Sequence, residues 1–241
     1  MYTGAVFFAV RVALDARVAA RWLPPGLRLG RPAVATVFAS HFPATSFGSV
    51  YDEAGVFFHV RRRFRDAVFC PWMVVTDDVA LVVGREMLGY PKKLARISFA
   101  YAGRDGGAFE EGSEVHAEVE RRGRRLLVLS GRLGKRDSKA PPMLGQRAMN
   151  VRGAFGPGAQ RLVTFTPRET IREARRATAT FEIGAGGGGL EEGRDPLGAL
   201  GLGRVLGARL YRVDVSAALP PRDVRGAGIG FALRSLGARW L

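Results

Sequence analysis

The sequence predicts an α+β fold, in which a few helices cover a curved, largely antiparallel and barrel-like sheet. Segments rich in Val, Phe, Leu and Thr and bounded by Gly or Pro recur along the 241 residues, whereas helical patterns are few. Hydrophobic residues make up 47% of the chain, which is typical of a protein with a packed core. No internal repeat or linker divides the sequence, so we expect a single domain over residues 1–241.

The expected strands are short apolar segments separated by turn residues. Residues 114–120 alternate between polar and apolar side chains, which predicts a half-buried strand. The arginine-rich segment that follows, residues 121–124, predicts a turn into the next strand. Strands are expected at residues 5–12, 34–38, 56–60, 69–75, 79–83, 95–102, 115–119, 126–133, 162–166, 177–183 and 208–215.

Helices are predicted at fewer places. Asp15 is a good N-cap for a helix over residues 15–22, which a Pro-Pro-Gly sequence ends. Residues 83–88 predict one or two helical turns before Gly89 and Pro91, and residues 140–150 are a weaker candidate. The glycine-rich residues 184–193 predict a loop without the spacing of a phosphate-binding motif.

The chain is strongly basic, with a formal net charge of +15 and a pI of about 11.2. All but four of its 37 basic residues are arginine, and they are spread along the sequence. The densest groups, residues 61–65 and 121–125, are expected to be strand ends or hairpins rather than a stripe that binds nucleic acid. We therefore expect no nucleic-acid partner, although a basic, non-catalytic protein that binds anions or nucleic acid remains an alternative.

Cysteine and histidine usage limits the chemistry further. Cys70 is the single cysteine, so no internal disulfide forms and a reducing, cytoplasmic setting is expected. The N-terminal apolar stretch contains arginines, which argues against a cleaved leader, and no apolar run approaches the ~18 residues of a membrane span. The three histidines have no metal-ligand spacing, and Cys70 is expected to be a small buried residue. We expect no metal site and no membrane partner.

Two of the four lysines, Lys92 and Lys93, stand side by side after a Gly-Tyr-Pro corner. An amine attacks a ketone only when it is unprotonated, and a free lysine with a pKa of about 10.4 is almost fully protonated at neutral pH. Burial and a neighbouring positive charge both lower the pKa of a lysine. Arginine stays charged and forms no imine, so it cannot replace a lysine in this role. An isolated Lys-Lys pair is usually only a solvated turn, and a longer motif is needed to favour catalysis.

Such a motif surrounds the pair. Gly-Arg-Glu at residues 84–86 and Tyr-Pro-Lys-Lys-Leu-Ala at residues 90–95 are similar to the active-site motif of acetoacetate decarboxylases. Weaker similarity covers most of the chain, including residues 51–55 and 207–220. The sequence thus resembles the acetoacetate decarboxylase family, and the resemblance implies the fold of that family.

The resemblance also implies a mechanism, in which the first lysine of the pair forms an imine with a β-keto acid. It places Lys92 as the nucleophile, Lys93 as the charge that lowers the pKa of Lys92, and Glu53 as a group that positions substrate or carries a proton. No metal or organic cofactor is expected, because the iminium is the electron sink. Family members generally form oligomers, so we expect a homo-oligomer that binds a small keto acid or carbonyl compound.

The substrate pocket is expected to include six further residues, with Arg85 and Glu86 also bracing the turn through an ion pair. In the members specific for acetoacetate, an arginine and a second glutamate align with Thr3 and Phe38, where this chain has no charge. The resemblance therefore leaves two reactions open, namely decarboxylation of a β-keto acid, and aldol condensation with dehydration or cyclisation through the same imine. The expected pocket residues are Phe38, Tyr51, Trp72, Arg85, Glu86 and Tyr90.

Overall fold

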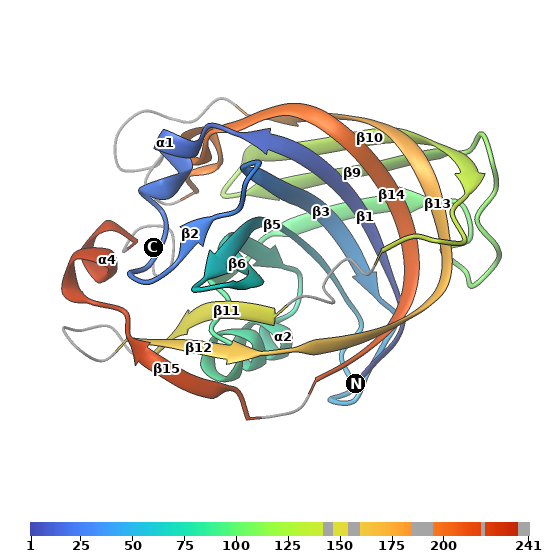
Figure 1. Cartoon of the computed structure of the whole chain (residues 1–241). Helices are drawn as coiled ribbons and strands as arrows, with labels where there is room; N and C mark the ends of the chain where they lie inside the picture. The colour runs from blue at the N-terminus through green and yellow to red at the C-terminus, as the bar shows by residue number, and fades with distance from the viewer. Residues whose placement is uncertain (142–146, 154–159, 185–194, 218–219, 236–241) are drawn as a thin grey trace.

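A single 15-stranded sheet organises the chain and curves strongly around one side of the molecule (Figure 1). The computed structural model describes residues 1–141, 147–153, 160–184, 195–217 and 220–235. The strands are β1 (Tyr2–Leu14), β2 (Arg28–Leu29), β3 (Val34–Phe42), β4 (Ala44–Thr45), β5 (Tyr51–Arg62), β6 (Arg65–Val75), β7 (Lys92–Leu94), β8 (Arg96–Tyr101), β9 (Glu114–Arg121), β10 (Arg124–Arg136), β11 (Arg147–Arg152), β12 (Arg161–Phe165), β13 (Pro167–Ile183), β14 (Leu202–Ala217) and β15 (Arg222–Gly226).

The sheet is mixed but mostly antiparallel. Its main path runs β15-β12-β11-β6-β5-β3-β1-β14-β13-β10-β9-β8, with β2, β4 and β7 attached beside it. Only the β6–β11 and β6–β7 pairs are parallel among the described strands. Strands β15 and β8 are the two ends of the path, so the sheet curves without closing on itself. The predicted fold class is confirmed.

The helices are short. Within the described ranges, none has the length and apolarity needed to cross a bilayer. They are α1 (Ala16–Ala20), α2 (Asp78–Val82), the π-helix η1 (Val83–Met87), the 3₁₀-helix η2 (Leu197–Leu200) and α4 (Ile229–Arg234). Helices α1 and α4 lie at the edge of the molecule and α2 lies behind β11 and β12 (Figure 1). The predicted cap is confirmed, because the Asp15 carboxylate accepts hydrogen bonds from the Arg17 and Val18 amides at the start of α1.

Side chains alternate across the strands and form two separate apolar cores. Along β1, Phe8 enters the larger core, which also holds Phe58 and Trp72. Its neighbour Phe7 enters the smaller core, on the opposite face of the sheet, together with Tyr51. The sheet is thus buried on both faces over much of its centre, and the smaller core is where the candidate site forms.

Two predicted elements are wrong. Residues 79–83 lie in α2 and the first residue of η1 instead of a strand, because the Asp77 carboxylate caps a helix by accepting a hydrogen bond from the Ala80 amide at 2.7 Å. A short apolar run does not by itself distinguish helix from strand. The helix predicted over residues 140–150 is replaced by β11 from Arg147 onward, where pairing with β6 and β12 decides the conformation. Residues 142–146 lie outside the described residues, as does the loop predicted at residues 184–193 from residue 185 onward.

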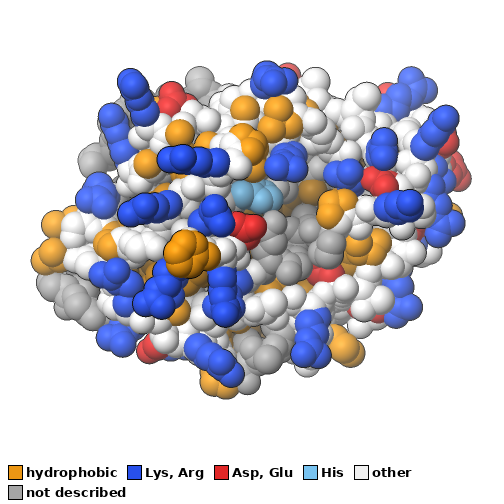
Figure 2. All heavy atoms as spheres, viewed as in Figure 1, with side chains coloured by type: hydrophobic (Ala, Val, Ile, Leu, Met, Phe, Trp, Pro, Cys, Tyr) orange, Lys and Arg blue, Asp and Glu red, His pale blue; other side chains and the backbone are white. Residues whose placement is uncertain are grey.

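The arginine groups behave as the sequence predicts. Arg122 and Gly123 have positive φ angles of 54° and 71° in the turn between β9 and β10. Arg63, at φ 56°, lies in the turn between β5 and β6. Figure 2 shows Lys and Arg side chains distributed over the visible face instead of gathered in one stripe. The two densest groups are therefore hairpin turns.

Candidate active site

The lysine pair is reached through a corner of unusual backbone geometry. The chain leaves α2 through the π-helix η1, and the amide of Tyr90 donates to the carbonyl of Gly84 at 3.0 Å. Gly89, at φ 72°, takes a left-handed conformation that favours glycine. The chain then enters β7, which pairs in parallel with β6 and places Lys92 opposite Met73. The motif thus builds a rigid corner that fixes the start of β7.

Gly84 is required by the path of the Lys92 side chain. A Cβ atom at position 84 would lie 2.5 Å from both Cδ and Cε of Lys92 and 3.0 Å from Nζ. No side chain fits at such distances, so the glycine of the motif leaves a channel for the lysine stem. This explains the glycine of the Gly-Arg-Glu part of the motif in physical terms.

Lys92 and Glu53 form a buried ion pair. Nζ of Lys92 lies 2.6 Å from Oε2 of Glu53, and the two side chains are only 5% and 7% exposed. Glu53 projects from β5, opposite Val75 of β6. A buried charge needs a partner, and each of these residues supplies the partner of the other. The pair carries no net charge.

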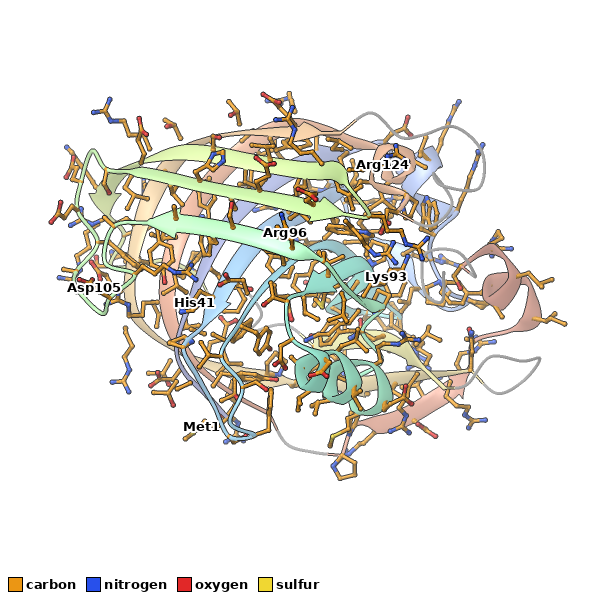
Figure 3. The ribbon with its side chains drawn as sticks, turned by 180° about the vertical axis from the view of Figure 1, so that it is seen from behind. Met1, His41, Lys93, Arg96, Asp105 and Arg124 are labelled. Carbon is orange, nitrogen blue, oxygen red and sulfur yellow. The ribbon has the colours of Figure 1, made fainter. Side chains whose placement is uncertain are left out.

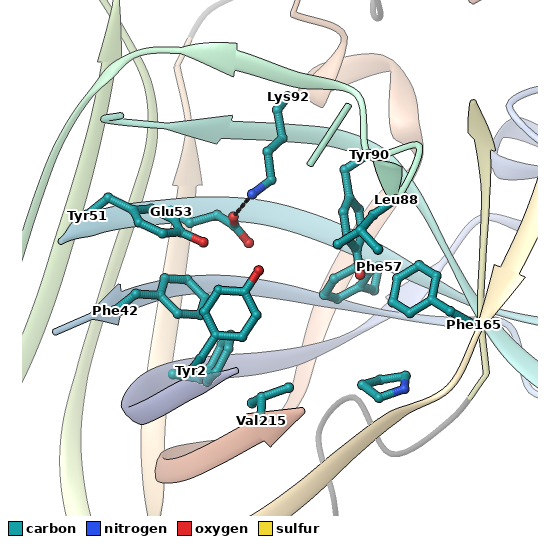
Figure 4. A pocket seen from close by; sticks show the side chains of 12 residues that line it. Tyr2, Phe42, Tyr51, Glu53, Phe57, Leu88, Tyr90, Lys92, Phe165 and Val215 are labelled. Carbon is teal, nitrogen blue, oxygen red and sulfur yellow. Dashed lines mark ion pairs between the residues drawn. The ribbon is translucent and has the colours of Figure 1, made fainter. Parts of the chain in front are cut away.

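The ion pair lines a small cavity of about 60 Å³ on the smaller-core face of the sheet (Figure 4). Nζ of Lys92 lies 5.4 Å from the ring centre of Tyr51 and 5.9 Å from that of Tyr90. The rest of the wall is mainly aromatic and aliphatic. The lining residues are Tyr2, Phe7, Phe42, Tyr51, Glu53, Phe57, Leu88, Tyr90, Lys92, Phe165, Pro167 and Val215.

The three tyrosines of the cavity are held in their protonated form. Burial, followed by the negative charge of Glu53, raises the pKa of Tyr2 to about 12. The same two causes raise the pKa of Tyr51 well above its ordinary value. Burial is also the main cause of the raised pKa of Tyr90. Each hydroxyl group therefore keeps its proton. Tyr51 donates a hydrogen bond to Tyr2, and Tyr2 and Tyr90 are available as hydrogen-bond donors.

Lys93 points to the other face of the sheet, toward Asp195 (Lys93 is labelled in Figure 3). Its Nζ lies 3.7 Å from Oδ1 of Asp195, which also accepts a hydrogen bond from Nε1 of Trp72 at 3.1 Å. Arg121 pairs with the other oxygen of Asp195 at 2.6 Å. Burial lowers the pKa of Lys93 to about 8, opposed by Asp195 and assisted by the charges of Arg121 and Arg122.

This placement corrects the expectation that Lys93 lies beside Lys92 as the charge that lowers its pKa. Lys92 and Lys93 are consecutive residues of a strand, so their side chains project to opposite faces. Their strand partners agree, because Met73, opposite Lys92, belongs to the smaller core and Val74, opposite Lys93, belongs to the larger one. The charge beside Lys92 is the carboxylate of Glu53, and not a second ammonium group.

Four of the expected site residues meet at the cavity, namely Lys92, Glu53, Tyr51 and Tyr90. The other five do not line it. Lys93 and Trp72 lie on the opposite face. Phe38 is buried behind the wall, where its ring stacks on Phe57 with centres 4.9 Å apart. Arg85 is half-buried and Glu86 is exposed, and both lie in η1 outside the lining.

Sequence reasoning missed most of the apolar wall. Phe57 carried a usable signal, because it lies on β5 at an even spacing from Tyr51 and Glu53 and so shares their face. Phe165, Pro167 and Val215 carried none, since they reach the cavity from β12, β13 and β14. Within the described residues, no group of three or more His, Cys, Asp or Glu side chains is arranged to hold a metal ion.

Comparison with known proteins gives one family. The family model described as Acetoacetate decarboxylase (ADC) matches residues 2–223. A curated relative, Acetoacetate decarboxylase 1 from Bradyrhizobium diazoefficiens, is 31% identical over 90 residues. That alignment covers 37% of this chain and 36% of the relative, so it spans about a third of the relative's length.

Solved structures share the fold over nearly the whole chain. An acetoacetate decarboxylase from Legionella pneumophila superposes with a TM-score of 0.75 at 16% identity, covering 93% of this chain and 86% of that one. An acetoacetate decarboxylase-like enzyme from Sphingomonas wittichii RW1 gives 0.74 at 20% identity, with 92% of each chain covered. The enduracididine biosynthesis enzyme MppR, in complex with the condensation product of pyruvate and imidazole 4-carboxaldehyde, gives 0.73 at 18% identity, covering 93% and 90%. At these identities the likeness is one of fold.

Proposed function

The chain belongs to the acetoacetate decarboxylase family, and we propose that it is a carbon–carbon lyase that works through an imine between Lys92 and a carbonyl substrate. The observation that carries this proposal is the buried amine of Lys92, 2.6 Å from the Glu53 carboxylate at the wall of a cavity. An imine-forming lysine needs burial, access to a small substrate and a group that moves protons, and this arrangement supports all three requirements.

Imine formation begins when Glu53 takes a proton from the Lys92 ammonium group and leaves a neutral amine. The amine nitrogen attacks the carbonyl carbon, the new C–N bond forms, and one proton of the attacking nitrogen passes to the former carbonyl oxygen, which gives a neutral carbinolamine. The protonated Glu53 then returns its proton to the departing hydroxyl group, which leaves as water. A single carboxylate at hydrogen-bond distance is sufficient for both transfers.

The tyrosine hydroxyl groups complete this step. The Tyr51 hydroxyl group donates a hydrogen bond to Tyr2, which fixes the position of the Tyr2 hydroxyl group. Because Tyr2 and Tyr90 also stay protonated, each can donate a hydrogen bond to an oxygen that gains negative charge during the attack. We assign Tyr2 and Tyr90 the role of oxyanion donors and Tyr51 the role of orienting Tyr2.

Two carbon–carbon reactions follow from the imine. In a β-keto acid, the electron pair of the bond to the carboxylate moves into the iminium group, which releases CO₂ and leaves an enamine. Protonation of the enamine carbon and hydrolysis then return the free lysine and a ketone. No metal or organic cofactor is required by these steps, because the iminium group accepts the electrons. Decarboxylation is the reaction for which the family is named, and it is the first to test.

An aldol-type reaction is the second candidate, in which the enamine carbon adds to another carbonyl compound before dehydration or cyclisation. One observation favours it, because Lys92 is the only cation among the described lining residues and no second one faces an incoming carboxylate. The MppR structure with a condensation product gives a precedent on the same fold.

Lys93 is proposed as a positioning residue, since it does not reach the cavity. Its contacts with Asp195, together with those of Arg121 and Trp72, hold β7 from the face opposite the substrate. The backbone of β7 then presents Lys92 to Glu53. Lys93 thus acts through the strand, and its expected effect is on the efficiency of imine formation.

Borohydride trapping tests the proposal. The protein is incubated with acetoacetate, or with pyruvate and an aldehyde, then reduced with borohydride and mapped by mass spectrometry, while CO₂ and condensation products are measured in parallel. We expect a reduced adduct on Lys92 that Lys92→Met abolishes and that Lys135→Met, an exposed-lysine control on β10, leaves unchanged. If none of the carbonyl compounds gives an adduct on Lys92, the proposal is wrong. That result would favour a basic, non-catalytic binding protein, whose binding to nucleic acid a salt-dependent gel shift would detect.

We also propose that the chain folds as one domain and assembles as a homo-oligomer. Sedimentation analysis of the full chain tests the assembly, and a single cooperative unfolding transition tests the single domain. A monomer across the micromolar range would contradict the first expectation, and two separate transitions would contradict the second.

A further inference from the structure

We propose that this site takes an uncharged ketone or aldehyde in preference to a keto acid, an inference that rests on the proposed imine at Lys92. It follows from the charge balance of the cavity. Of the lining residues that the structure describes, only Lys92 and Glu53 carry a charge, and they neutralise each other at 2.6 Å. The described wall therefore has no net charge to offer a charged substrate.

The other lining residues of the cavity are uncharged and also favour an uncharged substrate. Its polar groups are the tyrosine hydroxyl groups, which stay protonated and donate hydrogen bonds without carrying charge. The remaining side chains, such as Phe42, Phe165 and Val215, are apolar (Figure 4). A ketone carbonyl has partners here, whereas the rest of the substrate meets hydrocarbon.

A substrate carboxylate would be buried without a cation of its own. The nearby cations Lys93 and Arg121 pair with Asp195 on the opposite face of the sheet, and Arg85 lies outside the lining. Burying an uncompensated charge is costly, because the loss of hydration is not replaced. Binding of a keto acid should therefore be weaker, by on the order of tenfold or more, than binding of an uncharged compound of the same shape.

Imine formation does not remove the cost of burying a substrate carboxylate. The carbonyl oxygen leaves as water, and the new C=N bond keeps one positive charge on the Lys92 nitrogen when it is protonated. That charge again faces the single negative charge of Glu53. An uncharged ketone thus completes the reaction in a neutral cavity, whereas a keto acid leaves one net negative charge at the same stage.

The reaction class follows from the substrate. An uncharged ketone has no carboxylate to lose, so its iminium can form an enamine only by giving an α-proton to a base, for which Glu53 is placed. The enamine carbon then adds to a second carbonyl carbon, which forms a C–C bond and an alkoxide that takes up the proton. Hydrolysis releases the aldol product and the Lys92 amine, and the reverse sequence cleaves it.

A matched pair of ketones tests the inference with little difference in intrinsic reactivity. Levulinate and 5-methyl-2-hexanone are both unactivated methyl ketones with the same two-carbon spacer after the carbonyl group. Levulinate ends in a carboxylate, and 5-methyl-2-hexanone ends in an isopropyl group of similar shape. Borohydride trapping on the full-length protein is measured as a function of ketone concentration, with Lys92→Met as the blank. We expect half-maximal labelling of Lys92 at a concentration of 5-methyl-2-hexanone lower by on the order of tenfold or more.

A charge variant separates the effect of the wall's charge from other differences between the two ketones. Tyr2 is a half-buried lining residue, so Tyr2→Arg can add a cation to the wall with the least disturbance, and Tyr2→Gln is the uncharged control. We expect Tyr2→Arg to shift the preference toward levulinate by on the order of tenfold relative to Tyr2→Gln. The comparison uses the ratio of the two ketones within each variant, which cancels a general loss of activity.

The outcomes separate the two proposals. Labelling of Lys92 by both ketones with an equal or better response to levulinate would overturn the substrate inference and leave the imine intact. An unchanged ketone ratio in Tyr2→Arg would also count against it. No labelling by either ketone, with labelling by acetoacetate, would overturn the substrate inference, and no labelling by any of the carbonyl compounds would overturn the imine itself. Should Tyr2→Arg fail to fold, the wild-type comparison still decides the question.

Discussion

Nζ of Lys92 and Oε2 of Glu53 lie 2.6 Å apart, although their strands do not pair with each other. Lys92 belongs to β7 and Glu53 to β5, and β6 runs between them as the partner of both. Residues 51–55, which include Glu53, and the Lys-Lys motif are thus joined through a third strand. The contact depends on the register of two strand pairs, which makes it sensitive to small changes in either.

Replacing Glu53 by glutamine should separate binding from proton transfer. The amide keeps the size of the side chain but neither accepts nor returns a proton, so enamine formation should slow by about 10²–10⁴-fold. Exchange of the methyl protons of acetone for deuterium, followed by NMR, measures this step without knowledge of the natural substrate. Glu114→Gln, an exposed change on β9, is the control. An exchange rate in Glu53→Gln equal to that of the control would remove Glu53 from the mechanism.

Gly84→Ala should displace Lys92. The added methyl group would lie 2.5 Å from the lysine stem, so either the stem or the corner of η1 must move. We expect a loss of about 1–3 kcal/mol in the free energy of unfolding from overpacking, together with a fall in borohydride labelling of Lys92. Gly226→Ala is the matched control, because a methyl group there meets nothing within 4 Å. Labelling at the wild-type level in Gly84→Ala would show that the channel is not needed.

Asp195→Asn should destabilise the protein far more than the loss of a surface ion pair. Asp195 meets Lys93, Arg121 and Trp72 in a buried cluster, so removal of its charge leaves two cations there with less compensation. We expect the free energy of unfolding in urea to fall by about 3–5 kcal/mol. Asp223→Asn, which removes the partner of Arg152 at the surface, should cost only about 0–1 kcal/mol. Equal losses in the two variants would contradict this account of the cluster.

Mild acid should weaken the fold through His59. Burial, assisted by the charge of Arg11, lowers the pKa of His59 from 6.5 to about 4. Between these pH values the unfolded chain binds a proton that the folded chain does not, so the free energy of unfolding falls as the pH is lowered from 6.5 toward 4.

His59→Gln should therefore flatten the pH dependence of stability in this window, and chemical denaturation at pH 7, 5.5 and 4 measures it. His116→Gln, at an exposed position on β9, is the control. A slope unchanged by His59→Gln would show that other groups account for the acid sensitivity.

The sequence predicted which residues meet at the cavity better than it predicted the shape of the cavity. Lys92 and Glu53 could be selected because each sits in a segment similar to the acetoacetate decarboxylase family, and the structure brings them together. The face that Lys93 occupies was not identifiable, since a Lys-Lys pair in a turn can keep both side chains together and a pair in a strand cannot. Only the pairing of β7 with β6 decides between these cases.

The fold, like the site, is predicted from sequence only where local features decide it. The N-cap at Asp15 and the turn at Arg122 and Gly123 are local features, and local sequence predicted them. Residues 79–83 are apolar in either conformation, and the cap at Asp77 that selects a helix was overlooked. Phe165 and Val215 reach the cavity only because distant strands curve together, and no short segment of sequence carries that information.

The alternating faces of β7 make the two lysines a test of strand register. A shift of one residue along β6 would turn each lysine to the opposite face, and only one of the two could then occupy a position that a lysine holds now. Either Glu53 or Asp195 would lose its amine and remain as a buried carboxylate without that cation. The two ion pairs on opposite faces therefore favour a single alignment of β7 and disfavour the neighbouring ones.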